Sequence, residues 1–336
     1  MIQQAIVRLI DRQDLTRPEM AEVMGEIADG SATTSQIGAF LTLLRAKGET
    51  VDEIAGAAEV MRARAERVHV RREIFVDTCG TGGDGRHTFN VSTTAALVVA
   101  GAGVTVAKHG NRSVSSKCGS ADVLAALGVN VEASREVIER CIEQVGIGFL
   151  FAPKLHPAFK AAAGVRRELA VRTVFNLLGP LANPAGAPCQ VLGVYDSRHV
   201  ATLGLVLASL GTKHSFVVHG EGYDEITVTG QTLVCEVKAG HTENYTVTPE
   251  DAGVGRWRPQ DLEGGDAARN ARITADVLAG QKGAPRDAVL LNAAAALVAT
   301  GAASTLREGV RVASTSIDQG EAAAKLAALA RVSATA

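Results

Sequence analysis

Hydrophobic positions in the first part of the chain recur every three or four residues. Four such segments, "QQAIVRLIDRQ", "TRPEMAEVMGEIADG", "TTSQIGAFLTLLRAKG" and "TVDEIAGAAEVMRARAERV", fill residues 1 to about 65. This spacing predicts amphipathic helices. Thr16 with Glu19, and Thr50 with Glu53, have the spacing of a capping box and mark two helix starts. The pattern therefore predicts a small all-helical unit.

From "REIFVDTCGTGGDG" onward, short apolar runs such as "VTVAKHG", "IGFLFAP" and "SFVVHG" alternate with helical patterns. Strands separated by helices predict right-handed crossovers and a largely parallel sheet. Two stretches interrupt the alternation: "RTVFNLLGPLANPAGAPC" is predicted to be a long connection returning to the helical unit, and "TENYTVTPEDAGVGRWRP" an antiparallel addition.

These patterns together predict an α/β fold with two domains. The first is a small all-helical N-terminal domain, residues 1–70, completed by part of 160–190. The second is a larger α/β domain, residues 71–336, with a mostly parallel central sheet flanked by helices.

Charge and composition exclude several classes of partner. The 34 basic and 36 acidic residues leave a net charge of −2, and aromatic residues make up only 4% of the chain. Such a chain lacks both the field that recruits nucleic acid or an anionic membrane and the stacking platforms of single-strand binders. Five scattered cysteines without a C-x-x-C pair, and the lack of an apolar run long enough for a membrane span or signal peptide, predict a cytoplasmic protein.

The first candidate site is a glycine loop, "CGTGGDG", between the apolar run "FVDT" and the helical pattern "NVSTTAALVVAGAG". A strand, a glycine loop and a helix N-terminus expose backbone N–H groups where the helix dipole is positive, which favours a phosphate. The loop is neither G-x-G-x-x-G nor a P-loop, so ATP and NAD fit poorly. Glycines that serve only the turn remain an alternative at this point.

A second loop, "KHGNRSVSSKCGSAD", covers residues 108 to 122 and follows another predicted strand. Its cations, Lys108 and Arg112, stand beside a run of hydroxyls, a combination suited to a pyrophosphate or a sugar phosphate. The alternative is a solvated surface loop.

Further on, the adjacent acids Asp224 and Glu225 follow the predicted strand "SFVVHG". Paired carboxylates at a strand end suggest a Mg²⁺ ion held jointly by the protein and by substrate oxygens. Taken alone, two adjacent acids in a turn are usually just solvated.

Three arginines, Arg166, Arg167 and Arg172, occupy "GVRRELAVRTVFNLLGPLANP". Arginines so placed often pair with surface acids. One directed into a cleft would instead hold a substrate carboxylate in a bidentate manner.

Taken in order, "GTGGD", "NVST", "KHGNRSVSS", "CGSADVLAALGV", "RTVFNLLGPLANP" and the acidic pair after "VVHGEGY" closely resemble the anthranilate phosphoribosyltransferases. The resemblance implies a pentosyltransferase of tryptophan biosynthesis that moves the phosphoribosyl group of phosphoribosyl pyrophosphate onto the amino group of anthranilate. It also implies a cleft between the two domains, a homodimer formed through the helical domain, and Mg²⁺, two ions per subunit.

Two alternatives stay open. A pyrimidine nucleoside phosphorylase shares this fold, but the arginine-rich segment and the acidic pair argue against it. A catalytically silent relative that binds nucleic acid would need a basic face, which the near-neutral charge balance disfavours.

The resemblance further implies which residues bind the substrates, each by its place in a matching motif. These are Gly80, Gly83, Asp84, Thr88, Asn90, Val91, Ser92, Thr93, Lys108, His109, Gly110, Asn111, Arg112, Ser115, Ser116, Ser120 and Arg166. Asn111 and Arg166 are the implied anthranilate contacts, with Arg166 on the carboxylate and His109 lining the same path.

For the metal, the resemblance implies Ser92, Asp224 and Glu225, and the implied catalytic residues are Lys108, Asp224 and Glu225. Two departures from the family pattern stand out. Ala170 replaces a usual glycine in "RRELAVRT", where it is expected to shift the helix that carries Arg166, and "EGYDE" replaces a more usual "DGLDE".

Overall fold

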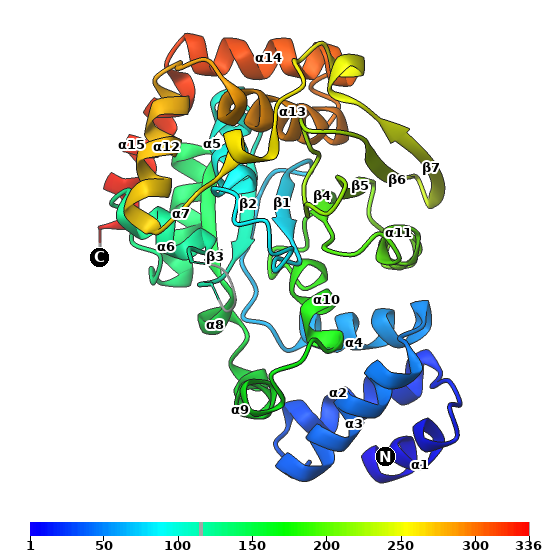
Figure 1. The fold of residues 1–336 in the computed structure, drawn as a ribbon. Helices are drawn as coiled ribbons and strands as arrows, with labels where there is room; N and C mark the ends of the chain where they lie inside the picture. Colours follow the sequence, from blue (N-terminus) through cyan, green and yellow to red (C-terminus); the bar gives the residue numbers. More distant parts are fainter. Residues whose placement is uncertain (114–116, 336) are drawn as a thin grey trace.

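The computed structural model describes residues 1–113 and 117–335 and divides them into a helical part and a larger part built on one sheet (Figure 1). The helical part begins with α1 (Ile2–Ile10), α2 (Arg17–Ala28), α3 (Thr34–Lys47) and α4 (Val51–Ala63). The capping boxes predicted at Thr16 and Thr50 are confirmed, and Thr33 forms a third with Gln36.

A seven-stranded sheet forms the larger part. Its strands are β1 (Val76–Gly80), β2 (Val106–Gly110), β3 (Ile147–Phe151), β4 (Cys189–Gly193), β5 (His214–His219), β6 (Thr232–Lys238) and β7 (His241–Val247). They lie in the order β3-β2-β1-β4-β5-β6-β7, with β1 to β5 parallel and β6 and β7 antiparallel. The mostly parallel sheet and its antiparallel addition are therefore confirmed.

The strand order creates a switch point between β1 and β4. The chain runs outward from β1 to β2 and β3, then returns to the opposite side of β1 with β4. In such sheets the loops at the carboxyl ends of the two central strands diverge, and ligands bind in the crevice between them. The glycine loop follows β1, which sets it at this crevice.

Helices cover both faces of the sheet, with α5, α7, α11 and α13 in contact with its strands. The helices that follow β1 are α5 (Val91–Gly101), α6 (Ser120–Ala126), α7 (Arg135–Val145), α8 (Ala152–Leu155), α9 (Lys160–Leu169), α10 (Val174–Leu181), α11 (His199–Ser209), α12 (Ala267–Leu278), α13 (Ala284–Ala299), α14 (Leu306–Asp318) and α15 (Glu321–Ser333). Short 3₁₀ turns occupy Pro157–Phe159, Pro249–Ala252 and Pro259–Leu262. No helix among these described residues is both long and apolar enough to cross a membrane.

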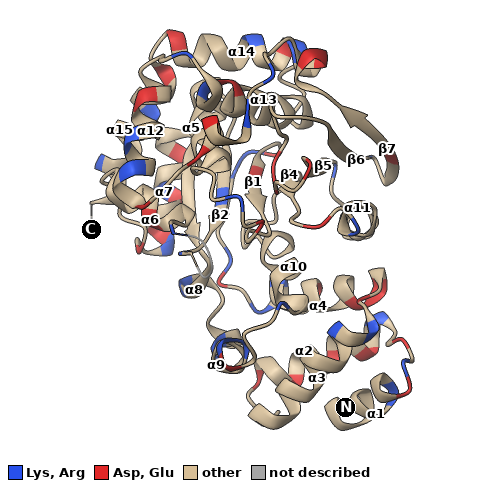
Figure 2. Ribbon diagram, in the orientation of Figure 1, with Lys and Arg blue, Asp and Glu red and all other residues tan. Residues whose placement is uncertain are grey.

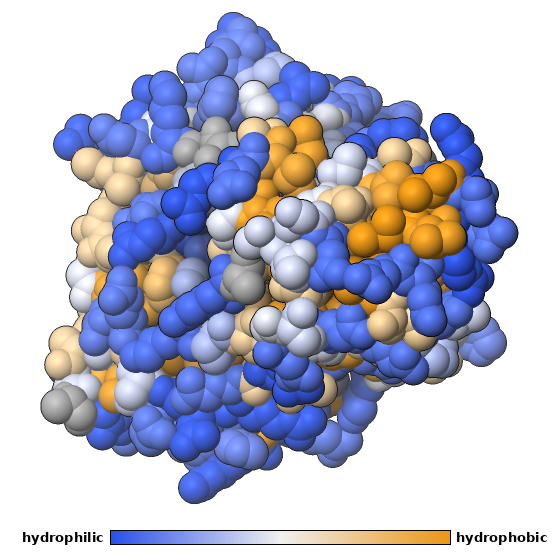
Figure 3. Space-filling view, turned by 90° about the horizontal axis from the view of Figure 1, so that it is seen from below, coloured by the Kyte–Doolittle hydropathy of each residue, from blue (hydrophilic) through white to orange (hydrophobic). Residues whose placement is uncertain are grey.

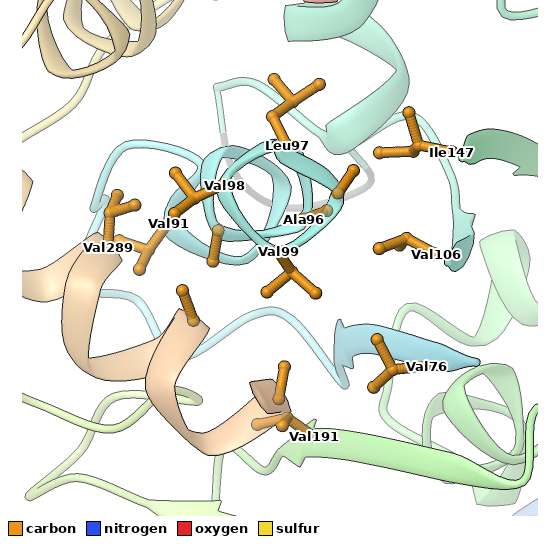
Figure 4. Close-up of a cluster of buried hydrophobic side chains, with 14 of the residues drawn as sticks. Val76, Val91, Ala96, Leu97, Val98, Val99, Val106, Ile147, Val191 and Val289 are labelled. Atoms are coloured by element: carbon orange, nitrogen blue, oxygen red, sulfur yellow. The ribbon is translucent and has the colours of Figure 1, made fainter. Parts of the chain in front are cut away.

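Alternate residues of the central strands enter two different cores, as the two-residue period of a strand requires. Val191 of β4 joins a cluster with Val76, Val106 and residues of α5 and α13 (Figure 4). Its neighbour Leu192 joins a second cluster, which includes α10, α11 and the N-terminal helices. One sheet face therefore packs on α5 and α13, and the other continues into the helical part.

The segment predicted as a long connection contains a helix of its own, α10, with Pro180 inside it. α10 and α9 contribute buried residues to the same cluster as α2, α3 and α4. Part of residues 160–190, α9 and α10, thus packs on the helical part. The boundary between domains 1–70 and 71–336 stays a prediction.

Candidate active site

The glycine loop after β1 depends on backbone conformations that other residues adopt poorly. Gly82, Gly83 and Gly85 have φ values of 66°, 72° and 75°. At the strand end, a Cβ on Gly80 would lie 2.5 Å from the Asp224 carboxylate, and one on Gly193 would lie 1.6 Å from the Asp224 backbone oxygen. Glycines therefore admit the acidic segment between the ends of β1 and β4.

Three carboxylates gather at this crevice, on Asp84, Asp224 and Glu225. Asp224 accepts a hydrogen bond from the Gly82 N–H at 2.7 Å, and the buried Oδ2 of Asp84 has no partner among the described residues. Burial, with the nearby Asp84 charge, raises the pKa of Asp224 to about 7. Burial and the Asp224 charge raise the pKa of Glu225 well above its usual range.

Lys108 supplies a cation beneath the same loop. It lies in the middle of β2, is 3% exposed, and its Nζ donates to the Thr78 carbonyl and lies 3.5 Å from the Ser92 hydroxyl. Burial lowers the pKa of Lys108, and the buried Asp77 and Glu225 oppose that shift. Asp77 is itself held by Asn183 at 2.8 Å. The strand core thus fixes the ammonium group beside Ser92.

The donor chemistry at this crevice suits a hard divalent cation. Ser92, Asp224 and Glu225 line one small cavity of mixed polar and apolar character together with Thr78 and Asn292. Carboxylate and hydroxyl oxygens are the ligands Mg²⁺ prefers, and the partnerless oxygen of Asp84 adds to the negative charge. Within residues 1–113 and 117–335, no group of three or more His, Cys, Asp or Glu side chains is arranged to hold a metal alone. A cation here would therefore complete its shell with ligand oxygens.

The second predicted loop starts at the end of β2 and runs into α6. Asn111 and Ser120 hold its base, since the Asn111 N–H donates to the Ser120 hydroxyl at 3.2 Å. A Cβ on Gly110 would lie 2.3 Å from that hydroxyl oxygen. Arg112 forms ion pairs with Asp122 at 3.2 Å and with Glu132 at 3.1 Å, so its charge is largely used by surface acids. The predicted site residues Ser115 and Ser116 lie outside the described residues.

The remaining predicted residues near the glycine loop belong to the loop's end and the first turn of α5. Phe89 is buried in the core, Thr88 pairs with Glu263 in an isolated antiparallel bridge, and Val91 and Thr93 are buried. Asn90 directly precedes α5. The structure therefore brings Ser92 to the cavity shared with Asp224 and Glu225, whereas the Asn90 side chain contacts Cys118 and Asn270.

His109 faces the helical part of the molecule. Its Nδ1 lies 3.0 Å from the Gly179 carbonyl oxygen, its buried Nε2 has no partner among the described residues, and its ring lies 5.2 Å from that of His156. Burial lowers the pKa of His109 to about 3 and that of His156 to about 4. Both imidazoles are therefore neutral at pH 7.

Arg166 lies on α9, a helix rich in basic residues that packs beside α2 and α3 (Figure 2). Its guanidinium packs over the Phe175 ring at 5.1 Å, and burial lowers its pKa. No acidic side chain in the described part of the chain forms an ion pair with it. An external anion would therefore meet no competing acid at Arg166, whereas at Arg112 it would share the guanidinium with Asp122 and Glu132.

Ala170 ends α9 in the left-handed conformation, at φ 51° and ψ 23°, and its N–H donates to the Arg166 carbonyl. This conformation explains why a glycine is usual at this position. Ala170 keeps the left-handed conformation that usually requires glycine, and its backbone is strained as a result.

Sequence reasoning named Arg172 only as one of three candidate arginines and missed Asn292, although both residues hold the site in place. Arg172 donates to the Gly83 carbonyl and stacks on Tyr195, 3.5 Å from the ring centroid. Asn292 of α13 donates to the Ile226 carbonyl at 2.8 Å and accepts from the Ile226 N–H at 3.0 Å, directly after Glu225. A lone asparagine in the apolar run "AVLLNAAAAL" was the available signal.

Two family models match the chain: a glycosyl transferase helical bundle domain at residues 3–65 and a glycosyl transferase a/b domain at residues 72–323. An anthranilate phosphoribosyltransferase from Anaeromyxobacter sp. (strain Fw109-5) is 70% identical over 99% of this chain and 98% of the relative. Its counterpart from Moorella thermoacetica is 55% identical over 98% and 97%.

Solved structures agree. An anthranilate phosphoribosyltransferase from Thermus thermophilus superposes with a TM-score of 0.94 at 43% identity, covering 98% of this chain and 99% of that one. The Saccharomyces cerevisiae enzyme in complex with PRPP and Mg gives 0.89 at 26% identity, over 99% and 97%. The chain therefore belongs to the glycosyl transferase family with a helical bundle and an a/b domain, and within it to the anthranilate phosphoribosyltransferases.

Proposed function

We propose that this chain transfers the phosphoribosyl group of phosphoribosyl pyrophosphate to the amino group of anthranilate. The products are N-(5-phosphoribosyl)anthranilate and pyrophosphate, in tryptophan biosynthesis. The observation that carries this function is the crevice between β1 and β4, where a glycine loop, Lys108 and three carboxylates with few partners meet. That set matches the charges of a pyrophosphate leaving group and its metal.

The phosphoribosyl pyrophosphate would be held by the glycine loop and by the loop after β2. Its proposed contacts are Gly80, Gly83, Asp84, Thr88, Asn90, Val91, Ser92, Thr93, Lys108, Gly110, Arg112, Ser115, Ser116 and Ser120. Backbone N–H groups and short hydroxyls suit its oxygens, and α5 directs the positive end of its dipole toward them. Lys108 would stabilise the charge that develops on the departing pyrophosphate.

Mg²⁺ would be held by Ser92, Asp224 and Glu225, with two ions per subunit as the proposal. The Saccharomyces cerevisiae relative in complex with PRPP and Mg supports the use of magnesium. Bound Mg²⁺ supplies charge neutralisation on the pyrophosphate as it leaves. The raised pKa values of Asp224 and Glu225 mean that these side chains release protons when a cation binds.

Anthranilate would meet Arg166 through its carboxylate, with Asn111 and the neutral His109 lining the same path. The arylamine is neutral at pH 7 and attacks the anomeric carbon as the bond to the pyrophosphate oxygen breaks. The nitrogen, positively charged after attack, then loses its proton readily, so no strong general base is needed. Catalysis then depends on alignment of the two substrates and on charge stabilisation.

We also propose a cytoplasmic homodimer that forms through the helical domain. Val7 and Ile10 of α1 are each 62% exposed, and Figure 3 shows apolar residues gathered on the lower face of the molecule. Such patches on soluble proteins often mark interaction surfaces. Replacing Ile10 with Asp should halve the particle mass measured by light scattering, and an unchanged mass would contradict this interface.

The function is tested by following anthranilate fluorescence after phosphoribosyl pyrophosphate is added, first with Mg²⁺ and then with a chelator. We expect the signal to fall only when both the cosubstrate and Mg²⁺ are present. A folded protein that leaves the signal unchanged, but splits a pyrimidine nucleoside in the presence of inorganic phosphate, would favour the phosphorylase alternative.

A further inference from the structure

The segment before α12 is bonded to the end of the glycine loop, although about 175 residues separate them in the sequence. Glu263 pairs with Thr88, the Gly264 N–H donates to the His87 carbonyl at 2.9 Å, and the Phe89 N–H donates to the Leu262 carbonyl at 3.4 Å. α12 itself packs on α6, which follows the second loop. The segment around α12 therefore supports both loops of the candidate site.

Asn270 of α12 links this segment to Asn90, which directly precedes α5, through its side-chain amide. It is 1% exposed, its Oδ1 accepts from the Gly265 N–H at 2.7 Å, and its Nδ2 donates to the Asn90 Oδ1 at 3.0 Å. A backbone N–H can only donate, so the Gly265 contact fixes which end of the Asn270 amide is oxygen. The nitrogen must then face Asn90.

This orientation passes on to Asn90. The Asn90 Oδ1 receives the Asn270 amide and also the Cys118 thiol at 3.4 Å. Burial raises the pKa of Cys118 to about 11, so the thiol keeps its proton and donates. Both acceptor positions of the Asn90 oxygen are thereby filled.

The other end of the Asn90 amide has capacity left. Its Nδ2 donates one N–H to the Cys118 carbonyl at 3.3 Å, and the second N–H has no partner among the described residues. Asn90 can therefore offer a ligand only a hydrogen-bond donor. A donor is what the anionic oxygens of a phosphate or pyrophosphate require.

We propose that Asn270 is a positioning residue that fixes Asn90 as a hydrogen-bond donor toward the phosphate groups of the substrate. The inference rests on the proposed function, because it assigns Asn90 to phosphoribosyl pyrophosphate. Asn270 acts through Asn90 and its amide contacts only protein groups in this structure.

The substitution Asn270→Asp tests this role most sharply. The new carboxylate still accepts from the Gly265 N–H, but it presents an acceptor where Asn90 needs a donor. The Asn90 amide should then turn over and direct its oxygen at the substrate. We expect the KM for phosphoribosyl pyrophosphate to rise about 10- to 100-fold, with little change in the KM for anthranilate.

A matched control lies one turn further along the same helix. Thr274 hydrogen-bonds Thr94 at 3.0 Å, and Thr94 in turn donates to the Asn90 backbone carbonyl, so Thr274 does not bond the Asn90 amide. Thr274→Val should therefore affect folding stability about as a buried polar contact does, and should leave the KM for phosphoribosyl pyrophosphate unchanged. A comparable rise in KM for Thr274→Val would show that general loosening of α12, and not amide orientation, is responsible.

A double-mutant cycle with Asn90→Ala separates orientation from structure. Asn90→Ala alone should raise the KM, and adding Asn270→Asp should raise it no further, because the oriented amide is already gone. If the KM increases of Asn90→Ala and Asn270→Asp instead multiply in the double variant, the proposal is overturned. If Asn270→Asp unfolds below the assay temperature, Asn270→Ser, which keeps a donor and an acceptor, replaces it in the cycle and should raise the KM less.

Calorimetric titration of the wild type, Asn270→Asp and Asn90→Ala with pyrophosphate and Mg²⁺ measures the same contact without turnover. Weaker binding by both variants supports the inference even if anthranilate is not the acceptor. Unchanged binding by both, in a wild type that turns over its substrates, overturns the role of Asn270 and leaves the proposed function standing.

Discussion

Two groups of inward-facing acids in this molecule differ in how fully they are partnered. Glu53 of the helical part is 0% exposed, and its carboxylate meets the Lys47 ammonium at 3.0 Å and the N–H groups of Leu15 at 2.9 Å and Thr50 at 2.8 Å. At the crevice, Asp224 has one backbone N–H, from Gly82, and no described residue bonds the Glu225 carboxylate.

The difference separates structural acids from functional ones. A carboxylate buried among donors and a cation contributes to the fold, because removing any partner leaves an unpaired charge. Carboxylates buried near one another with few donors oppose the fold when ionised, and their raised pKa values record that cost. Such a group is retained where a ligand, here a cation, supplies the missing partner.

The largest effect that would break this comparison is expected at Glu225. Glu225→Gln removes a proposed metal ligand while keeping the side-chain size, so the Mg²⁺-dependent turnover should fall about 100-fold or more. The free energy of unfolding without metal should stay level or rise. Turnover is read from anthranilate fluorescence and stability from urea denaturation.

Glu221→Gln is the control for that experiment, since Glu221 lies in the same loop, is exposed and is outside the proposed metal site. It should keep its turnover. If Glu225→Gln turns over at the wild-type rate, Glu225 is not a functional acid.

At Glu53 the opposite pattern is expected. Glu53→Gln leaves the nearly buried Lys47 without its buried counter-charge, so the free energy of unfolding should drop by about 3 kcal/mol. Folded molecules should turn over normally. Glu59→Gln on the same helix, which disrupts only an exposed pair with Arg17, should cost less than about 1 kcal/mol. Equal losses in the two variants would contradict the assignment.

The pH dependence of stability sharpens the comparison further. The folded pKa of Asp224, about 7, lies above its unfolded value, so the folded state binds more protons. Stability without metal should therefore fall as the pH rises from about 4 through 7. In chelator, Tm should be lower at pH 8 than at pH 6, and Mg²⁺ should raise Tm more at pH 8. An equal Mg²⁺ effect at both pH values would argue against these carboxylates as the ligands.

The smallest effect is expected at Ala170, which belongs with the structural group although it lies near Arg166. Ala170→Gly relieves the left-handed strain and should raise the free energy of unfolding by about 0.5–1 kcal/mol. The KM for anthranilate should not change. A lower KM would mean that the strain displaces Arg166, as the sequence led us to expect.

Local signals were enough to predict much of this fold. Capping boxes, the glycine loop and the alternation of strands with helices are each specified by residues close together in the sequence. The same spacing of Thr50 and Glu53 that predicted a helix start gave no indication that Glu53 is buried against Lys47 and Leu15. The helix α10 was missed because the Gly-Pro step within it and the Asn-Pro step just after it are typical of a connection.

Long-range positioning was beyond the sequence. Asn270 contacts Asn90 across 180 residues, and Asn292 contacts Ile226 across 66 residues. Neither asparagine carries a local pattern that names its partner. The Arg112 ion pairs with Asp122 and Glu132 likewise depend on how α6 and the following turn pack. The sequence does not reveal these two partners, so sequence reasoning assigned the Arg112 charge to a ligand alone.

The hydrophobic cluster that joins the helical part to one face of the sheet has a consequence for cooperativity. It runs without interruption from Leu41 and Ile54, through Leu178, to Leu192 and Val217. Because each part covers apolar surface of the other, we expect a single calorimetric transition on heating. A fragment beginning at residue 71 would lose α4, which packs on α10 and α11, and would expose the apolar surface of those two helices to water. Such a fragment should aggregate, so the N-terminal helices keep the larger part soluble by covering it.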